Sequence, residues 1–100
     1  MVLAGQPTLR TLDGERQLEE GELVAFPAGR SGAHRIDNRG EQPARVLVVS
    51  TMIAPEVNEL PDSGKVWART SPPGAPRPEE AVDILVRPGD ERIDYFDGEA

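Results

Sequence analysis

The sequence has no cysteine, one histidine and only four aromatic residues in a chain of 100. Without cysteine there can be no disulfide and no thiolate ligand for a metal. The chain also lacks a basic cluster, because 18 acidic residues outnumber 11 basic ones and give a formal net charge of -7. Such a chain is repelled by phosphate backbones, so we do not expect nucleic acid as a partner.

Long apolar runs are missing as well. No run approaches the roughly 18–20 apolar residues that a helix needs to cross a bilayer. The first ten residues, MVLAGQPTLR, lack the basic start and the apolar stretch of about 7–15 residues of a secretory signal. We therefore expect a soluble cytoplasmic protein without a membrane partner.

Glycine and proline are abundant, with 10 of each. Average usage would give roughly 12 of the two together in a chain of this length, and the surplus shortens regular elements and multiplies turns. The turn residues recur about every eight to twelve positions, which is typical of a β-sandwich or β-barrel. The sequence predicts one small all-β domain rather than a helical bundle.

The first predicted strands are separated by clear turn signals. A strand over residues 8–12 meets Asp13-Gly14, a strong signal for a two-residue hairpin, and residues 15–18 form the returning strand. Residues 23–26 form an apolar strand that Pro27 ends, and a glycine-containing loop follows.

The strand after this loop carries the only histidine. If it starts near His34, alternation places His34, Ile36 and Asn38 on one face and Arg35 and Asp37 on the other. Because Ile36 is apolar, we expect the first face to point inward.

Three later strands are predicted. Residues 45–50, RVLVVS, form the most β-branched run, which favours a central strand buried on both faces. Residues 57–60 and 65–69 form a pair around a Pro-Asp-Ser-Gly turn.

The remaining residues, 71–100, are predicted to form a connector and a tail. Residues 71–78 hold four prolines and read as a stiff linker between a body, residues 1–70, and an acidic tail, residues 79–100, that packs on it. Alternating apolar residues at 82–86 and 93–95 predict a C-terminal β-hairpin. A short helix beginning at Pro78 is the alternative, because Pro followed by two Glu suits a helix N-terminus.

Residues 21–38, GELVAFPAGRSGAHRIDN, resemble the second signature motif of the cupin superfamily. Gly21, Pro27, Gly29, His34 and Asn38 occupy its positions, with four residues between Gly29 and His34 where the motif commonly has two. The resemblance, closest to small bacterial single-domain cupins, implies an antiparallel β-barrel of jelly-roll type.

Cupins usually hold a divalent metal, such as iron, manganese, zinc or nickel, inside the barrel. The resemblance places His34 at the metal ligand of the second motif. The first motif, which supplies two His and a Glu, is absent, and only Gly5 matches its closing glycine. We therefore expect an N-terminally incomplete barrel, in which His34 binds a metal only if other ligands come from elsewhere.

Three residues are candidates for ligand binding. His34 is interpreted as a metal ligand, as a hydrogen-bonded residue that lines the barrel, or as a surface residue. Arg30, in the loop before it, could contact an anion, and Asn38 closes the motif. No residue is assigned a catalytic role, because no acid–base pair or nucleophile has a supporting sequence context.

Two functions remain open. The first is a non-catalytic module that binds a small molecule or forms oligomers. The second is a metal-dependent cupin enzyme, an oxygenase or isomerase, whose first motif is missing from this chain. Because lost strands would leave unpaired edges, we expect a homodimer through the N-terminal edge.

Overall fold

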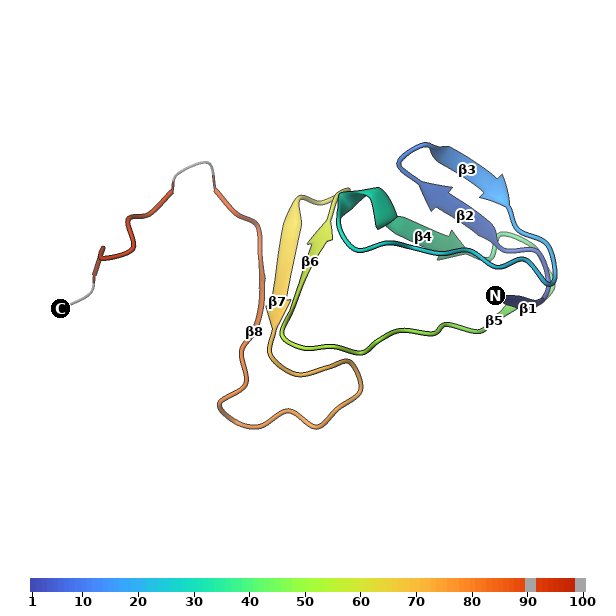
Figure 1. Ribbon diagram of the computed structural model, residues 1–100. Coiled ribbons are helices and arrows are strands. Elements are labelled where there is room, and N and C mark those ends of the chain that lie inside the picture. The colour runs from blue at the N-terminus through green and yellow to red at the C-terminus, as the bar shows by residue number, and fades with distance from the viewer. Residues whose placement is uncertain (90–91, 99–100) are drawn as a thin grey trace. The chain divides into compact units, whose positions relative to one another are not determined.

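The computed structural model describes residues 1–89 and 92–98. The backbone forms two compact units, Met1–Ile53 and Ala54–Ala100, which we call unit 1 and unit 2. Figure 1 shows short strands joined by long irregular segments, and all of the strand pairs of the described residues are antiparallel. Unit 1 contains β1 (Val2–Ala4), β2 (Thr8–Thr11), β3 (Gly14–Gln17), the short 3-10 helix η1 (Arg30–Gly32), β4 (His34–Asp37) and β5 (Arg45–Val46).

A three-stranded sheet with β2 at its centre forms one half of unit 1. The predicted hairpin at Asp13-Gly14 is confirmed, since Thr11 pairs with Gly14 and Thr8 pairs with Gln17. On its other edge β2 pairs with β4, which places Leu9 beside Ile36. The only histidine therefore lies at the start of an edge strand.

Strand β1 is hydrogen bonded along both of its edges. On one side it pairs with β5, and the Met1 amino group and the Leu47 carbonyl oxygen are 2.8 Å apart. On the other side the Val2 amide donates to the Glu22 carbonyl oxygen at 3.0 Å, and the Gly21 amide donates to the Val2 carbonyl oxygen at 2.8 Å. The N-terminal strand thus has backbone hydrogen bonds on both sides, although its sheet consists of β1 and β5 alone.

The buried core of unit 1 is small. Val2, Leu9 and Leu18 are almost fully buried, and Val24 and Phe26 pack against them while staying partly exposed. These side chains come from β1, from β2 and from the chain after β3, so the core joins the two sheets of this unit.

Two predictions for unit 1 are wrong. Residues 23–26 are extended but form no strand, because their backbone has no strand partner. Residues 45–50 were expected to be a central strand buried on both faces, but only Arg45–Val46 is a strand, and it pairs with β1 alone. Val48 and Val49 are 76% and 85% exposed.

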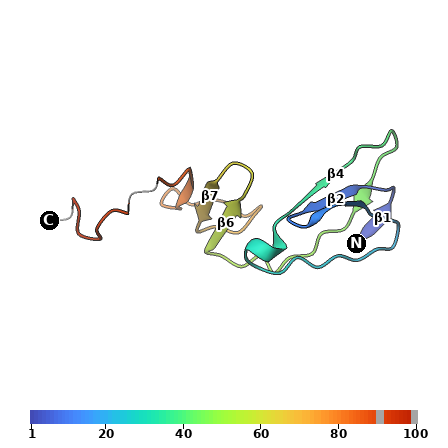
Figure 2. The same ribbon diagram turned by 90° about the horizontal axis from the view of Figure 1, so that it is seen from above.

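Unit 2 is built around a three-stranded meander. Strands β6 (Glu56–Leu60), β7 (Lys65–Arg69) and β8 (Asp83–Val86) lie side by side in that order, and Figures 1 and 2 both show β6 beside β7. The predicted pair of residues 57–60 and 65–69 is confirmed, with a turn over residues 61–64. Trp67 donates to Asp83 at 2.6 Å, and the Arg69 guanidinium lies 4.0 Å from the Trp67 ring centroid.

The predicted C-terminal hairpin is wrong. Strand β8 does form, but it pairs with β7 instead of with residues 93–95, and within residues 92–98 there is no strand. Nor does a helix begin at Pro78, where the backbone makes a turn closed by the Ala81 amide and the Pro78 carbonyl oxygen. The division at residues 70 and 78 into body, connector and tail stays a prediction.

The observed architecture is all-β, as the sequence predicts. The strands of the described residues form three separate antiparallel sheets and do not close into a barrel. Among these residues there is also no helix long and apolar enough to cross a membrane.

Candidate functional site

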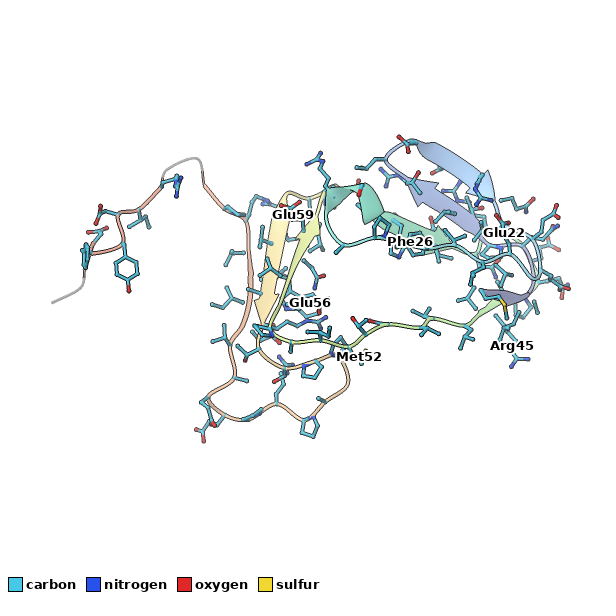
Figure 3. All side chains as sticks on the ribbon, in the orientation of Figure 1. Glu22, Phe26, Arg45, Met52, Glu56 and Glu59 are labelled. Atoms are coloured by element: carbon cyan, nitrogen blue, oxygen red, sulfur yellow. The ribbon has the colours of Figure 1, made fainter. Side chains whose placement is uncertain are left out.

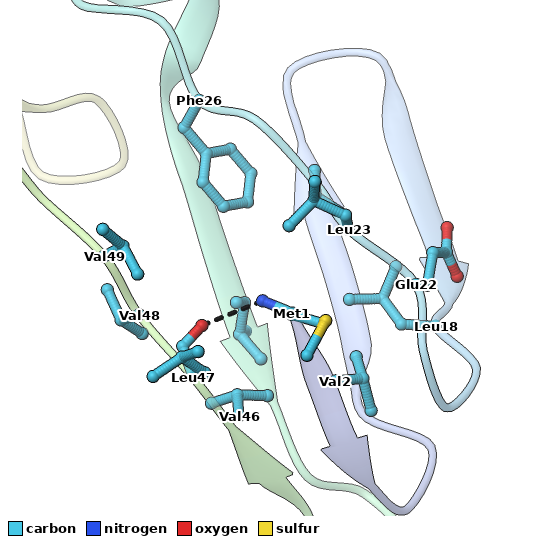
Figure 4. A pocket seen from close by; sticks show the side chains of 12 residues that line it. Met1, Val2, Leu18, Glu22, Leu23, Phe26, Val46, Leu47, Val48 and Val49 are labelled. Carbon is cyan, nitrogen blue, oxygen red and sulfur yellow. Dashed lines mark hydrogen bonds between the residues drawn. The ribbon is translucent and has the colours of Figure 1, made fainter.

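Unit 1 contains an open apolar pocket of about 230 Å³ (Figure 4). Eleven of its twelve lining residues are apolar, and the twelfth is Glu22. The lining comprises Met1, Val2, Leu18, Glu22, Leu23, Val24, Phe26, Ile36, Val46, Leu47, Val48 and Val49. In Figure 4, Val46 to Val49 stand on one side and Leu18, Leu23 and Phe26 on the other.

Two segments, residues 22–26 and 46–49, supply eight of the twelve lining residues, and most of their length has no strand partner. Residues 22–26 follow the hydrogen bonds that tie Gly21 and Glu22 to β1. Residues 46–49 continue from β5, and the last backbone bonds there join Met1 and Leu47. Since residues 23–26 and 47–49 pair with no second strand, their apolar side chains remain open to a ligand instead of forming a closed core.

Glu22 is the one carboxylate of the pocket. Its side chain accepts a hydrogen bond from the Glu19 amide at 3.0 Å and forms an ion pair with Arg16. The amide first, and Arg16 second, lower the pKa of Glu22 below its ordinary value. Glu22 is therefore ionised near neutral pH, and its charge is already satisfied by partners of its own.

The loop between Phe26 and β4 depends on two glycines. Gly29 has φ 91° and ψ -175°, a conformation that is practically restricted to glycine. At Gly32 a Cβ atom would lie 1.8 Å from the Pro27 carbonyl oxygen, so no larger residue fits. Together they fold η1 back against Pro27 and begin β4 at His34.

His34 is held by two contacts. Its ring stacks on Phe26 with the ring centroids 3.4 Å apart and the planes within 8°. Its Nδ1 lies 2.8 Å from the Gly32 carbonyl oxygen, and because a carbonyl only accepts, Nδ1 carries the proton. The residue is exposed overall, whereas Ile36, on the same face of β4, lines the pocket.

The donor set does not fit the divalent metal that the cupin motif implies. A stable transition-metal site needs at least three protein ligands, and histidine ligands are usually oriented through their second ring nitrogen. The Nδ1 contact of His34 meets the second condition. However, no group of three or more His, Asp or Glu side chains that could hold a metal occurs within residues 1–89 and 92–98.

The other two predicted binding residues lie apart from the pocket lining. Arg30 is exposed in η1. The Asn38 side chain donates to the Gln42 carbonyl oxygen at 2.9 Å and accepts from the Gly40 amide at 3.3 Å, so it closes the turn after β4. Binding by Arg30, Asn38 and His34 stays a prediction.

An ion-pair cluster fastens the outer face of the β2 sheet. Arg39 donates to both carboxylate oxygens of Glu15, at 2.8 and 2.9 Å, and lies 3.5 Å from Asp37. Arg35 donates to Asp37 at 2.7 Å, which confirms that Arg35 and Asp37 share the outward face. Arg39 lowers the pKa of Glu15, and Arg35 lowers that of Asp37.

Phe26 and residues 46–49 were missed as pocket residues because their apolar runs were interpreted as buried strands. The available signal was that each run is uninterrupted and therefore apolar on both faces. Such a run fits a doubly covered strand, and it equally fits an unpaired segment that lines a cavity.

Comparison with known proteins supports the motif. A family model of the cupin domain matches residues 1–50, which include β1 to β5 and the whole pocket lining. No curated protein and no solved structure matches the chain. With half of its length matched, this chain belongs to the cupin domain family.

Proposed function

We propose that this cupin-like chain is a non-catalytic binding module whose pocket takes a small, predominantly apolar molecule. The observation that carries the proposal is the open pocket of about 230 Å³ with eleven apolar residues among twelve in its lining. Pockets for small molecules are concave and mostly apolar, and a few polar groups orient the ligand.

The pocket volume limits the size of the ligand. An apolar cavity of about 150 Å³ is large enough for a benzene molecule. A pocket of about 230 Å³ suits a ring with a short substituent or an aliphatic chain of similar volume. Because Glu22 already has a hydrogen-bond donor and an ion-pair partner, the polar end of such a ligand would reach the open side of the pocket.

The chemistry of the lining favours binding over catalysis. It holds no serine, threonine, cysteine, lysine or histidine, and its one side-chain carboxylate is paired. A general acid–base mechanism needs a titratable group within hydrogen-bond reach of the reacting atoms. His34 lies outside the lining, and its ring is engaged by Phe26 and Gly32.

A homologous series of alcohols from butanol to octanol tests the proposal by calorimetry. Each added methylene that enters the pocket contributes about 0.8 kcal/mol, or about fourfold in affinity, until the pocket is full. We expect this increase in the wild-type protein and expect it to stop within the series.

Two isoleucine variants provide the control. Ile36 lines the pocket from β4 and is 37% exposed, whereas Ile84 lies in β8 of unit 2 and is 50% exposed. Ile36→Trp fills the pocket and should abolish the chain-length dependence, and Ile84→Trp should keep it. An equal dependence in both variants, or none in the wild-type protein, would show that the pocket is not the binding site.

A further inference from the structure

One side of the Phe26 ring is covered, and the rest of the ring borders the pocket. The His34 ring stacks on Phe26 with the two planes within 8°, and His34 is itself held by the Gly32 carbonyl oxygen. Phe26 lines the pocket and His34 does not. A ligand in the pocket therefore meets the other face of the Phe26 ring or its edge, while His34 supports the ring from behind.

Phe26 is the one aromatic residue of residues 1–53, and the other apolar residues of the lining are aliphatic. Trp67, Tyr95 and Phe96 all lie in unit 2. Two aromatic rings attract each other in offset-stacked or edge-to-face arrangements, and this adds about two- to tenfold in affinity to what the buried area alone provides. An aliphatic ligand of the same size gains only the buried area.

The pocket has two walls that suit a flat molecule. Figure 4 shows residues 46–49 on one side and Leu23 and Phe26 on the other. Three of the four residues 46–49 are valines, whose side chains are branched at Cβ and have few rotamers. Such a wall loses little side-chain freedom when a ligand binds. A planar ring between the two walls would contact the valines with one face and Phe26 with the other.

The aromatic part of the pocket lies apart from its carboxylate. Figure 3 shows Phe26 and Glu22 at opposite ends of the segment that they share, and four extended residues span up to about 13 Å. Glu22 is already paired with Arg16 and the Glu19 amide. A ring can therefore lie against Phe26 without removing a charged group from water, which would be costly.

We propose that the ligand is a neutral compound with a single aromatic ring and a short polar substituent, and that Phe26 selects it over an aliphatic compound of the same size. This ligand class belongs to the same pocket and therefore rests on the proposed function. A benzene molecule fits in an apolar cavity of about 150 Å³. The pocket of about 230 Å³ leaves room for a short substituent on such a ring.

NMR titrations of the full chain with benzyl alcohol and with cyclohexylmethanol test the selection. The two compounds share the ring size and the substituent and differ in aromaticity, so the ratio of their dissociation constants is the measured quantity. From the wild-type protein to Phe26→Leu, this ratio should shift against benzyl alcohol by about two- to tenfold. Leu23→Val changes the same wall and leaves Phe26 in place, so it should keep the wild-type ratio.

Contacts observed in the wild-type protein keep the test decisive if Phe26→Leu is poorly folded. Bound benzyl alcohol should give nuclear Overhauser effects between its ring protons and those of Phe26, and none to Phe96 in unit 2, which is 73% exposed. An unchanged ratio in folded Phe26→Leu, or ligand contacts that omit Phe26, would overturn the selection by Phe26 while both compounds still bind. If neither compound binds, the proposed function itself is wrong.

Discussion

At the scale of single residues, the cupin motif is explained by its contacts. Gly29 adopts a backbone conformation that is practically restricted to glycine, Gly32 lies against Pro27, and Asn38 closes a turn. His34 completes the set by stacking on Phe26, which lines the pocket. The motif in this chain therefore builds the wall and the loop of an apolar pocket.

The Phe26 ring stacks on His34 and packs against the core of unit 1. Its removal should therefore lower the stability of the protein. Phe26→Ala deletes the stack with His34 and part of the core packing, and we expect the free energy of unfolding to fall by about 1–2 kcal/mol. Urea denaturation measures this change. Phe96→Ala removes a ring that is 73% exposed and should change stability by less than about 0.5 kcal/mol. Equal losses would contradict the assigned role of Phe26.

The ion pairs of Arg39 make unit 1 sensitive to acid. The pKa of the Glu15 carboxyl is lowered from its ordinary value of 4.5 and that of Asp37 from 3.8, so both favour folding while ionised. This contribution is complete above those ordinary values and is lost as the pH falls through the lowered ones. Arg39→Gln should therefore destabilise the protein near neutral pH, and it should destabilise it less at about pH 3, where part of this contribution is already lost.

Urea midpoints at the two pH values check this prediction. Arg30→Gln makes the same charge change at a residue for which the structure shows no ion pair within the described ranges, so it should be neutral at both. A loss in Arg39→Gln that is the same at both pH values would mean that packing, not charge, is responsible.

At the scale of elements, the loop before β4 positions the site through close backbone contact. A methyl group at Gly32 would meet the Pro27 carbonyl oxygen at 1.8 Å, so Gly32→Ala must push the loop away from Pro27. We expect a loss of about 2–3 kcal/mol, typical of overpacking, together with weaker ligand binding. Gly40→Ala meets nothing closer than 3.7 Å and should be tolerated. Thermal unfolding of the two variants separates these outcomes.

The elements that were predicted correctly from the sequence are hairpins whose pairing is set by the turn between their two strands. Asp13-Gly14 specifies a hairpin through its own backbone preference, and the turn at residues 61–64 lets residues 57–60 find residues 65–69 nearby. The prediction of a central strand at residues 45–50 failed because a β-branched composition favours extended backbone but does not supply a partner strand. The prediction of a C-terminal hairpin failed for a related reason, since β8 pairs with β7, which lies more than a dozen residues earlier in the chain.

The candidate site was predicted in part. The motif residues located the loop and His34, which are set by backbone conformation and close approach. The pocket itself depends on residues 22–26 and 46–49 lying across from each other, and alternation within either segment alone does not reveal that pairing. Sequence patterns thus identified the loop before β4 and His34, but they did not identify the residues that line the pocket.

At the scale of the whole molecule, the family match and the acidic residues lie mostly in different parts of the chain. The cupin match covers residues 1–50, whereas residues 54–100 carry 11 of the 18 acidic residues and 5 of the 11 basic ones. The family match and most of the negative charge therefore lie in different parts of the chain.

The central claim is that the apolar pocket of unit 1 is a ligand-binding site, and the most direct test is a titration of the wild-type protein with hexanol, followed by NMR of methyl groups. We predict saturable shifts for the methyl groups of Val24, Ile36 and Leu47, which line the pocket, and none for those of Ile84 and Val86 in β8. Shifts of similar size in both sets, or no saturation in the first, would contradict it.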